Sequence, residues 1–236
     1  MTLSIIIPVY NEENHLETVL SEVFDTPFSK EIIIINDGSI DGTKTALDKI
    51  ERNFKTNPQK LVEKLRIIHK EKNEGKGAAI ISGVAVSTGD IVIIQDADLE
   101  LSPKEYGKLL EPFEKFDADI VFGSRFQMAG TRRVFSTKKY LANRLLTIIS
   151  NILSGIYLTD METCYKLFKR NVIQSFNLHS QRFGIEPELT AKAAKGGYKI
   201  YEVPIGYNPR TVREGKKIGW KDGVEALMAI VRYNIW

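Results

Sequence analysis

The chain has 236 residues, of which 43% are hydrophobic and 27% are charged, a composition typical of a globular protein and a length sufficient for one large domain or two small ones. Its net charge of +3 is too small for a concentrated basic face, so nucleic acid is not expected as a partner. The single cysteine, Cys164, excludes an internal disulfide and a cysteine-based zinc site. It fits a reducing compartment, and we expect it to be a small buried hydrophobe.

The sequence shows no targeting segment. Met1 leads almost at once into Ile5–Ile7 without a basic region or a small-residue cleavage site, so no signal peptide is predicted. The sequence also lacks an uninterrupted run of about 18 apolar residues, so no helix is expected to span a bilayer. We therefore expect a cytoplasmic protein and leave open whether it contacts a membrane surface.

The first half of the chain alternates short β-rich apolar runs with segments of helical period. The predicted strands are 3–9, 31–36, 65–69, 91–95 and 119–122. The predicted helices are 14–24, 41–54, 76–86 and one that begins at Ser102-Pro103. Since strands alternate with helices, we expect an α/β fold with a mostly parallel, Rossmann-like central sheet flanked by helices. In such sheets ligands collect beyond the carboxyl ends of the strands.

The second half loses this rhythm. Its predicted helices are 137–158, 186–195 and 222–234, and its predicted strands are 163–169 and 198–204. A polar, basic loop at 208–219 precedes the last helix. No linker or repeat divides the chain, so residues 1–236 are expected to form a single domain with a regular half, 1–125, and a less regular half, 126–236.

The strongest local signal is Asp96-Ala97-Asp98, which directly follows the predicted strand 91–95. This strand is continuously apolar and is therefore expected near the centre of the sheet. In extended chain the two carboxylates would share a face, and hard oxygen ligands so placed suit Mg²⁺ or Mn²⁺. A metal there can bridge two phosphates and neutralise a departing diphosphate. The alternative is a helix-capping loop with solvated acids.

Loops after three other predicted strands fall on the same edge of the sheet. Pro8–Glu12 follows the first strand, Asn36–Ser39 the second and Gly123–Arg125 the fifth. Asp37 is placed to accept a nucleobase ring N–H, although its segment also fits a plain turn. Arg125 is placed to hold a phosphate in a fork, with a surface ion pair as the alternative. Acid-bearing loops gathered on one edge favour a ligand site there.

Asn73–Gly77 is a glycine-containing basic loop that opens the helix predicted from Lys76. Backbone N–H groups at such a helix start attract anions. The segment is not a Walker A loop, because the spacing and the terminal Lys-Ser/Thr pair of that motif are missing.

Five segments occur in the order found in family 2 glycosyltransferases: Pro8–Glu12, Asn36–Ser39, Asn73–Gly77, Asp96–Asp98 and Gly123–Arg125. More narrowly, nearly the whole chain resembles the dolichyl-phosphate mannose and glucose synthases and their bacterial polyprenyl-phosphate relatives. The resemblance implies the GT-A fold and an inverting, metal-dependent transfer of one hexose from a GDP- or UDP-linked sugar to a polyprenyl phosphate. It assigns 1–125 to nucleotide-sugar binding and 126–236 to acceptor binding.

The resemblance and the basic loop together suggest roles for single residues. The donor nucleotide would be bound by Pro8, Tyr10, Glu12, Asp37, Lys76, Asp96 and Ala97. The metal, Mg²⁺ or Mn²⁺, would be held by Asp96, Asp98 and Glu100. Catalysis would involve Asp98, Arg125 and Asp160, the last facing the sugar or the acceptor unless it is a solvated turn residue.

Phosphate would be met by Arg125 and by the basic loop before the last helix, which carries Arg210, Arg213, Lys216 and Lys217. A mobile basic lid suits a diphosphate-bearing donor, with a solvated surface as the alternative.

The sequence departs from the family pattern in two places. Glu100 stands where the mannose synthases usually carry Gln, which makes the metal site more anionic without changing its class. The Gln-x-x-Arg-Trp signature of processive polysaccharide synthases is absent, and Gln181-Arg182-Phe183 is only a superficial echo of it. We therefore expect one sugar per turnover.

Residues 132–158 join a basic start to an apolar helix, the composition of a membrane-interfacial element. The alternative is a core helix with a solvated basic end. In the lipid-phosphate synthases this region lies near the lipid acceptor, so the resemblance favours peripheral contact with the cytoplasmic membrane face through 137–158. The lack of a spanning helix also suits a separate membrane subunit as a partner.

The nature of the acceptor decides whether a general base is needed. The phosphate oxygen of a polyprenyl phosphate is already anionic near neutral pH, so catalysis would consist of positioning and charge neutralisation. An alcohol acceptor would require a carboxylate base, for which Asp160, Glu186 and Glu188 are candidates.

Three other functions compete with this reading. A family 2 transferase could act on a hydroxyl of a soluble substrate or glycan, and a non-catalytic nucleotide-sugar sensor could keep only the base contacts. A haloacid-dehalogenase-type phosphatase also uses Asp-x-Asp, but there the pair follows the first strand, whereas here it follows the fourth.

Overall fold

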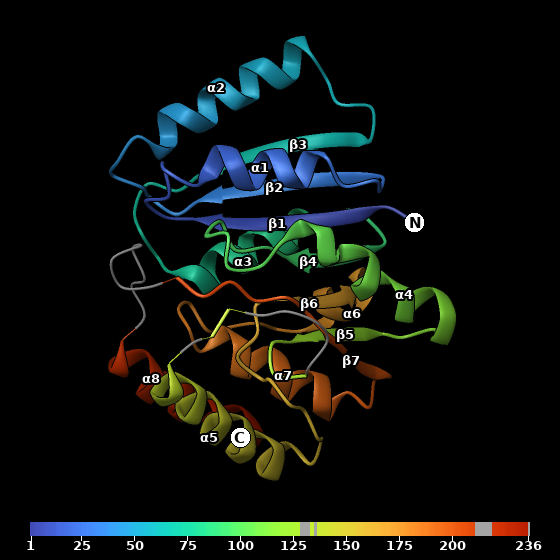
Figure 1. Ribbon diagram of the computed structural model, residues 1–236, viewed down its shortest axis with the longest axis vertical. Coiled ribbons are helices and arrows are strands. Elements are labelled where there is room, and N and C mark those ends of the chain that lie inside the picture. The colour runs from blue at the N-terminus through green and yellow to red at the C-terminus, as the bar shows by residue number, and fades with distance from the viewer. Residues whose placement is uncertain (128–132, 135, 211–218, 236) are drawn as a thin grey trace.

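The structure, a computed structural model, describes residues 1–127, 133–134, 136–210 and 219–235. Within these residues the centre of the fold is a seven-stranded sheet with the order β3-β2-β1-β4-β6-β5-β7 (Figure 1). The strands are β1 Leu3–Val9, β2 Lys30–Asn36, β3 Val62–His69, β4 Ile91–Ile94, β5 Ile120–Ser124, β6 Lys166–Lys169 and β7 Ile200–Pro204. Strands β1 to β4 run parallel to their neighbours in this set, as the alternating pattern predicted.

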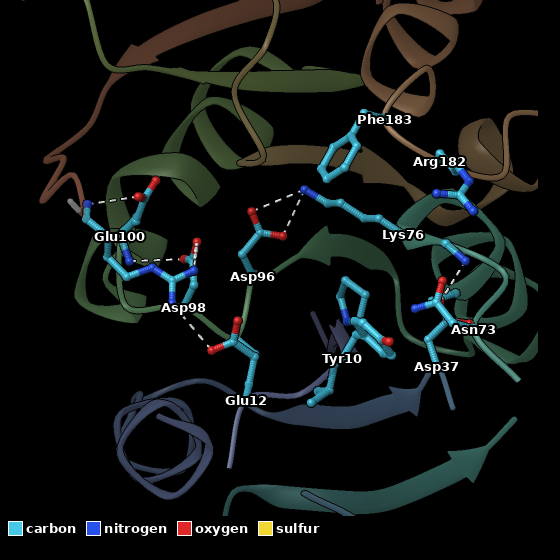
Figure 2. Close-up of a pocket in the computed structure, with 16 residues that line it drawn as sticks. Tyr10, Glu12, Asp37, Asn73, Lys76, Asp96, Asp98, Glu100, Arg182 and Phe183 are labelled. Atoms are coloured by element: carbon cyan, nitrogen blue, oxygen red, sulfur yellow. Dashed lines mark hydrogen bonds and ion pairs between the residues drawn. The ribbon is translucent and has the colours of Figure 1, made fainter. Parts of the chain in front are cut away.

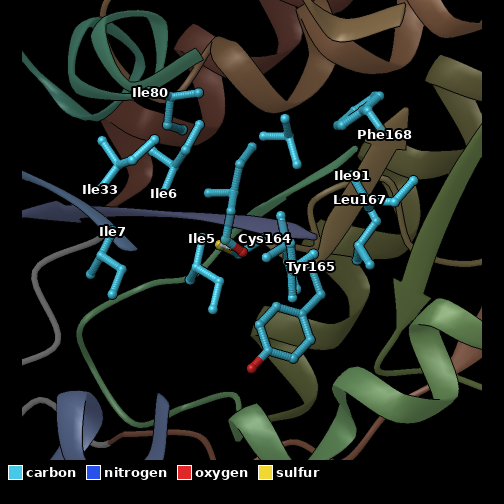
Figure 3. Close-up of a cluster of buried hydrophobic side chains, with 14 of the residues drawn as sticks. Ile5, Ile6, Ile7, Ile33, Ile80, Ile91, Cys164, Tyr165, Leu167 and Phe168 are labelled. Carbon is cyan, nitrogen blue, oxygen red and sulfur yellow. Dashed lines mark hydrogen bonds between the residues drawn. The ribbon is translucent and has the colours of Figure 1, made fainter. Parts of the chain in front are cut away.

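The neighbouring inner strands β1 and β2 each carry a continuous run of buried isoleucines. Ile5–Ile7 and Ile32–Ile35 have no exposed surface, so both faces of the sheet are buried here. Figure 3 shows the adjoining cluster, in which Ile80 of the helix Lys76–Val86 and Leu167 of β6 pack on the same core. Cys164 belongs to this cluster and is 5% exposed, as expected for a small buried hydrophobe.

Strand β6 is the topological feature that the sequence pattern did not reveal. It pairs antiparallel with both β4 and β5, so it lies between two strands that point the same way. The carboxyl end of β5, where Gly123–Arg125 begins the next loop, therefore lies on the same edge of the sheet as the end of β4. The expected placement of this loop is correct, although the strand between was expected to start at 163 rather than at Lys166.

Helices cover the sheet and extend beyond one end of it. They are α1 Leu16–Phe24, α2 Thr43–Thr56, α3 Lys76–Val86, α4 Tyr106–Phe116, α5 Thr137–Ser154, α6 Arg170–Ser175, α7 Ile185–Lys195 and α8 Trp220–Ile235, with a 3₁₀ turn at Pro103–Glu105. Helix α3 packs against β1 and β2, and α4 packs against β5 and β7. In Figure 1, α2 lies at one end of the molecule and the α5, α7 and α8 group at the other.

Two of the departures from the predicted helices have identifiable reasons. The helix expected over 137–158 ends at Ser154, because Gly155 adopts a left-handed conformation with φ 75° that cannot continue a helix. The short helix α6 was not predicted, since six residues are too few for helical periodicity to show.

Candidate functional site

A cavity of about 330 Å³ opens at the carboxyl edge of β1, β2 and β4 (Figure 2). Ten of the residues singled out from the sequence line it: Pro8, Tyr10, Glu12, Asp37, Lys76, Asp96, Ala97, Asp98, Glu100 and Arg210. Six more complete the wall: Val9, Asn73, Gly75, Ala79, Arg182 and Phe183. The expected gathering of strand-end loops therefore produces one concave site, which is the usual form of a small-ligand pocket.

A buried glutamine holds the Asp96–Asp98 turn on the core. Gln95 has no exposed surface, and its Oε1 accepts hydrogen bonds from the hydroxyls of Tyr106 and Tyr165 at 2.7 and 2.6 Å. Its Nε2 donates to the carbonyl oxygens of Asp96 and Leu101 at 2.8 and 3.3 Å. The turn that carries the two acids is thus clamped at both ends by one side chain.

Asp96 faces the ammonium group of Lys76, which comes from the first turn of α3. The Nζ of Lys76 lies 2.8 and 3.1 Å from the two carboxylate oxygens (Figure 2). Burial opposes ionisation of Asp96, but Lys76 outweighs it and lowers the pKa of the carboxyl below its ordinary value. Burial likewise opposes the charge on Lys76, but Asp96 is the first of the neighbours that raise the pKa of the ammonium well above its usual range. Both groups are therefore charged at neutral pH.

Asp98 lies in a more anionic environment. Burial first, and then the charges of Asp96 and Glu100, raise its pKa to about 6. The guanidinium of Arg210 offsets part of this effect, since its Nη2 donates to Asp98 Oδ2 at 3.0 Å while its Nη1 lies 3.4 Å from Glu12 Oε2. The backbone N–H of the same arginine donates to Glu100 Oε1 at 2.8 Å. Arg210 thus bridges three acids of the cavity.

Asp37 lies at the opposite side of the cavity and organises a loop. Its Oδ2 accepts the backbone N–H of Gly75 at 2.7 Å, and both carboxylate oxygens accept the N–H of Glu74, at 3.1 and 3.2 Å. Gly38, with φ 67°, permits the close approach of this loop, because a Cβ there would lie 2.6 Å from the backbone nitrogen of Asn73. Figure 2 shows Tyr10 and Asn73 on this side of the cavity, away from Asp98.

A segment that the sequence reading set aside contributes to the wall. Arg182 and Phe183 belong to the segment that only superficially resembles the processive motif, and both line the cavity. The carbonyl oxygen of Gln181 accepts the N–H of Ala78 at 2.9 Å, so this segment caps the start of α3. A Cβ at Gly75 would lie 2.5 Å from the same oxygen, and one at Gly77 would also clash with this segment, so the glycines of the loop permit the close approach.

Arg125 and Asp160 are brought together, but neither is among the residues that line the cavity. Nε and Nη2 of Arg125 donate to Asp160 Oδ2 and Oδ1 at 2.7 and 2.8 Å, a bidentate pair whose carboxylate has no exposed surface. The fork expected to hold a phosphate is therefore engaged by a carboxylate, and Asp160 is a buried partner rather than a solvated turn residue. Their assignment to phosphate binding and catalysis stays a prediction.

The candidate bases differ in how far they are engaged. Glu188 accepts the backbone N–H groups of His179 and Ser180 at 2.9 and 2.7 Å, which indicates a structural role. Glu186 pairs with Lys166 at 2.5 Å. Glu162, which the sequence reading did not consider, has a pKa raised to about 7, mainly by burial. This value suits a group that exchanges protons near neutral pH.

The carboxylates suit a divalent cation in chemistry but do not converge in the described residues. No group of three or more His, Cys, Asp or Glu side chains in that part of the chain is arranged to hold a metal ion. The reason is visible in the contacts: Asp96 faces Lys76, and Asp98 faces Arg210. Burial raises the pKa of Asp98 first, and the charges of Asp96 and Glu100 raise it further. Their carboxylate oxygens are hard ligands, so the donor set would fit Mg²⁺ or Mn²⁺ if Lys76 and Arg210 withdrew. Three residues of the basic loop that was expected to meet phosphate, Arg213, Lys216 and Lys217, lie outside the described residues.

Helices α5 and α8 pack side by side (Figure 1). Both helices expose apolar side chains. We call this the α5–α8 surface, formed by Leu141, Leu145, Ile148 and Ile152 of α5 and by Val224, Leu227, Met228, Val231 and Ile235 of α8. The α5 residues recur at helical spacing, and the exposed Lys138 and Lys139 stand at the start of the same helix. Among the described helices none combines the length and the apolar content needed to cross a membrane.

Comparison with known proteins agrees with this geometry. The family model described as "Glycosyl transferase family 2" matches residues 4–176. The polyprenol monophosphomannose synthase of Mycolicibacterium smegmatis is 27% identical over 98% of this chain and 86% of its own length. The undecaprenyl-phosphate mannosyltransferase of Micrococcus luteus is 27% identical over 100% and 95%. A dolichyl-phosphate beta-glucosyltransferase of Trichomonas vaginalis is 32% identical over 87% of this chain, which spans only 65% of that relative.

Solved structures show the same fold at low sequence identity. Glucosyl-3-phosphoglycerate synthase from Mycobacterium tuberculosis, in complex with Mg²⁺ and uridine diphosphate, has a TM-score of 0.72 and 18% identity over 99% of this chain and 79% of its own. The same enzyme with Mn²⁺, uridine diphosphate and phosphoglyceric acid has a TM-score of 0.71. The expected GT-A fold is confirmed.

Proposed function

Because the chain belongs to glycosyl transferase family 2, we propose that it transfers one hexose from a nucleoside-diphosphate sugar to a polyprenyl phosphate, with inversion at the sugar carbon and with Mg²⁺ or Mn²⁺. One observation carries the proposal. A single cavity joins a side lined by Asp37, Asn73 and Tyr10 to a side lined by Asp96 and Asp98. The distribution suits a ligand with a nucleoside at one end and a diphosphate at the other.

At the nucleoside end, Asp37 keeps acceptor capacity after binding the backbone of Glu74 and Gly75. A carboxylate offers about four lone-pair positions, and three hydrogen bonds to these N–H groups occupy three of them. The remaining position is suited to a ring N–H of the base. Tyr10, 36% exposed at the rim, offers an aromatic face to the same ligand.

At the diphosphate end, the chain supplies both acids and cations. A divalent cation bound by Asp96 and Asp98 would neutralise charge that develops on the departing diphosphate. The Nε of Arg210 is buried and has no hydrogen-bond partner among the described residues, which leaves a donor for a phosphate oxygen. A phosphate oxygen of the acceptor forms the new bond to the sugar carbon as the bond to the diphosphate breaks. No proton has to be removed from such an acceptor, because its oxygen is already anionic near neutral pH.

The α5–α8 surface supports a lipid acceptor. Its apolar stripe with lysines at one end has the composition of an element that lies in a membrane interface. The relatives named as polyprenol, undecaprenyl and dolichyl phosphate enzymes point to the same class of acceptor. We propose peripheral attachment at this surface, with or without a separate membrane subunit.

A hydroxyl acceptor is the second candidate. It is favoured by the structural neighbour solved with phosphoglyceric acid and by Glu162, whose pKa of about 7 suits a general base. In that case the acceptor would be a soluble molecule and the α5–α8 surface would serve another purpose.

The two candidates are separated by offering radiolabelled GDP- and UDP-hexoses with Mn²⁺ to the full chain. One set of reactions contains a short polyprenyl phosphate in detergent, and a matched set contains 3-phosphoglyceric acid. We expect label in the lipid product alone. Label transferred to the hydroxyl acceptor without any transfer to the lipid would overturn the proposal and establish the second candidate.

A further inference from the structure

Lys76 contacts two acids that belong to different parts of the fold. Its Nζ lies 2.8 Å from Asp96 Oδ1 in the turn after β4, and 3.3 Å from Glu186 Oε1 in the first turn of α7. The side chain is 18% exposed, so it is largely enclosed by the protein. Helices α3 and α7 therefore meet through one ammonium group at the wall of the cavity.

The carboxylate oxygen of Glu186 that faces Lys76 can still accept a hydrogen bond. The residue is 4% exposed, and its Oε2 accepts a hydrogen bond from the buried Lys166 at 2.5 Å. Its Oε1 has no hydrogen-bond partner among the described residues, although Lys76 lies within ion-pair distance. A buried carboxylate oxygen left in this state is costly unless another state of the protein satisfies it.

Lys166 is not free to satisfy this oxygen. Its ammonium also donates to the carbonyl oxygens of Met161 and Thr163, at 2.8 and 2.5 Å, and it has no exposed surface. All three of its donors are engaged. Lys76 has a flexible four-carbon stem and is the group that can respond.

Building on the divalent cation of the proposed function, we propose that Glu186 receives the Lys76 ammonium when the cation takes its place at Asp96. In the structure Lys76 neutralises Asp96 and competes with a metal for the same oxygens. A transfer onto Glu186 Oε1 clears Asp96, keeps the ammonium paired and leaves it beside the diphosphate. Glu186 is then a positioning residue that acts through Lys76, and not a general base.

Mn²⁺ binding to the full chain tests this movement of the Lys76 ammonium from Asp96 to Glu186 (the Lys76 transfer) without any turnover. Isothermal titration with Mn²⁺, in the presence of a nucleoside diphosphate, is carried out on the native protein, Glu186→Gln, Lys76→Met and the double variant. If Glu186 acts by receiving Lys76, Glu186→Gln weakens Mn²⁺ binding about tenfold when Lys76 is present, but by less than about twofold in the Lys76→Met background. A larger effect of Glu186→Gln in the presence of Lys76 than in its absence would support the Lys76 transfer.

A charge-preserving variant separates contact from long-range electrostatics. Glu186→Asp keeps the negative charge but withdraws it from Lys76, so we expect it to weaken Mn²⁺ binding as Glu186→Gln does. Circular dichroism of each variant verifies the fold, since Gln retains an acceptor for Lys166. If Glu186→Gln weakened Mn²⁺ binding equally in both backgrounds, the Lys76 transfer would be overturned, but the proposed function would not be affected. Failure of the native protein to bind Mn²⁺ would overturn both.

Discussion

The clamp formed by Gln95 makes a sharp prediction about stability. Gln95→Met keeps the approximate volume of the side chain but removes its acceptor and its donors. The hydroxyls of Tyr106 and Tyr165 then lose their hydrogen-bond acceptor in a region where neither side chain has exposed surface. Each orphaned buried group costs about 1–3 kcal/mol, so the two hydroxyls together lower the free energy of unfolding by about 2–6 kcal/mol.

The same reasoning predicts a rescue. If the cost arises from the stranded hydroxyls, adding Tyr106→Phe and Tyr165→Phe to Gln95→Met removes the groups that lack a partner. We expect the triple variant to be more stable than Gln95→Met by about 2 kcal/mol or more, because replacing both partners of a buried hydrogen bond is nearly neutral.

Urea unfolding followed by circular dichroism measures both effects. The slope of each transition should stay unchanged, since none of these variants alters the surface exposed on unfolding. The reasoning would be refuted if the triple variant were less stable than Gln95→Met alone. That result would mean that the tyrosine hydroxyls find other partners and that the turn after β4 is held by packing.

Three further predictions concern the site, the buried acids and the surface. Asp98→Ala should abolish sugar transfer while circular dichroism and the melting temperature show an intact fold; unchanged turnover would contradict the site assignment. The fold raises the pKa of Glu162 from 4.5 to about 7, so the folded state binds the extra proton and stability is lost as the pH rises through this interval. Glu162→Gln stays neutral at every pH. Urea unfolding should therefore show that the free energy of unfolding of this variant rises relative to that of the native protein between about pH 5 and about pH 8. A difference that does not change with pH would refute the assignment of this effect to Glu162. Leu145→Gln with Ile152→Gln should weaken sedimentation with anionic vesicles about tenfold and leave the melting temperature nearly unchanged, because both side chains are exposed.

The regular half of the fold could be predicted because its signals are local. Leu3–Val9 and Ile91–Ile94 are short and carry runs of isoleucine and valine, a pattern that favours buried strands. The direction of β6 could not be predicted in this way. Lys166–Lys169 carries no mark of its orientation, which depends on the path of the chain through α5.

The candidate site likewise contains residues whose placement could be predicted from the sequence and residues whose placement could not. Asp37 and Asp96 follow strands, so their meeting at one edge follows from the sheet alone. Arg182 comes from a segment after β6, far later in the chain, and the neighbouring Gln181 is held at the start of α3 by a backbone hydrogen bond. A contact of this kind depends on tertiary packing, and neither periodicity nor spacing records it.

The Asp96-Ala97-Asp98 segment shows how acids that are predicted to bind a metal can instead be paired with cations of the chain. Asp96 and Asp98 lie in the expected place, but the chain neutralises them with Lys76 and Arg210. An unpaired pair of partly buried carboxylates would be costly, since each would be desolvated beside a like charge. The side chains of Lys76 and Arg210 remove that cost while no nucleotide sugar is bound. For the metal to bind, they must leave these oxygens, so donor affinity depends on where they go as much as on the acids themselves. If the site binds a cation as proposed, the strength of binding would depend partly on Glu186 of α7 and on Arg210 after β7, because these residues contact Lys76 and Asp98.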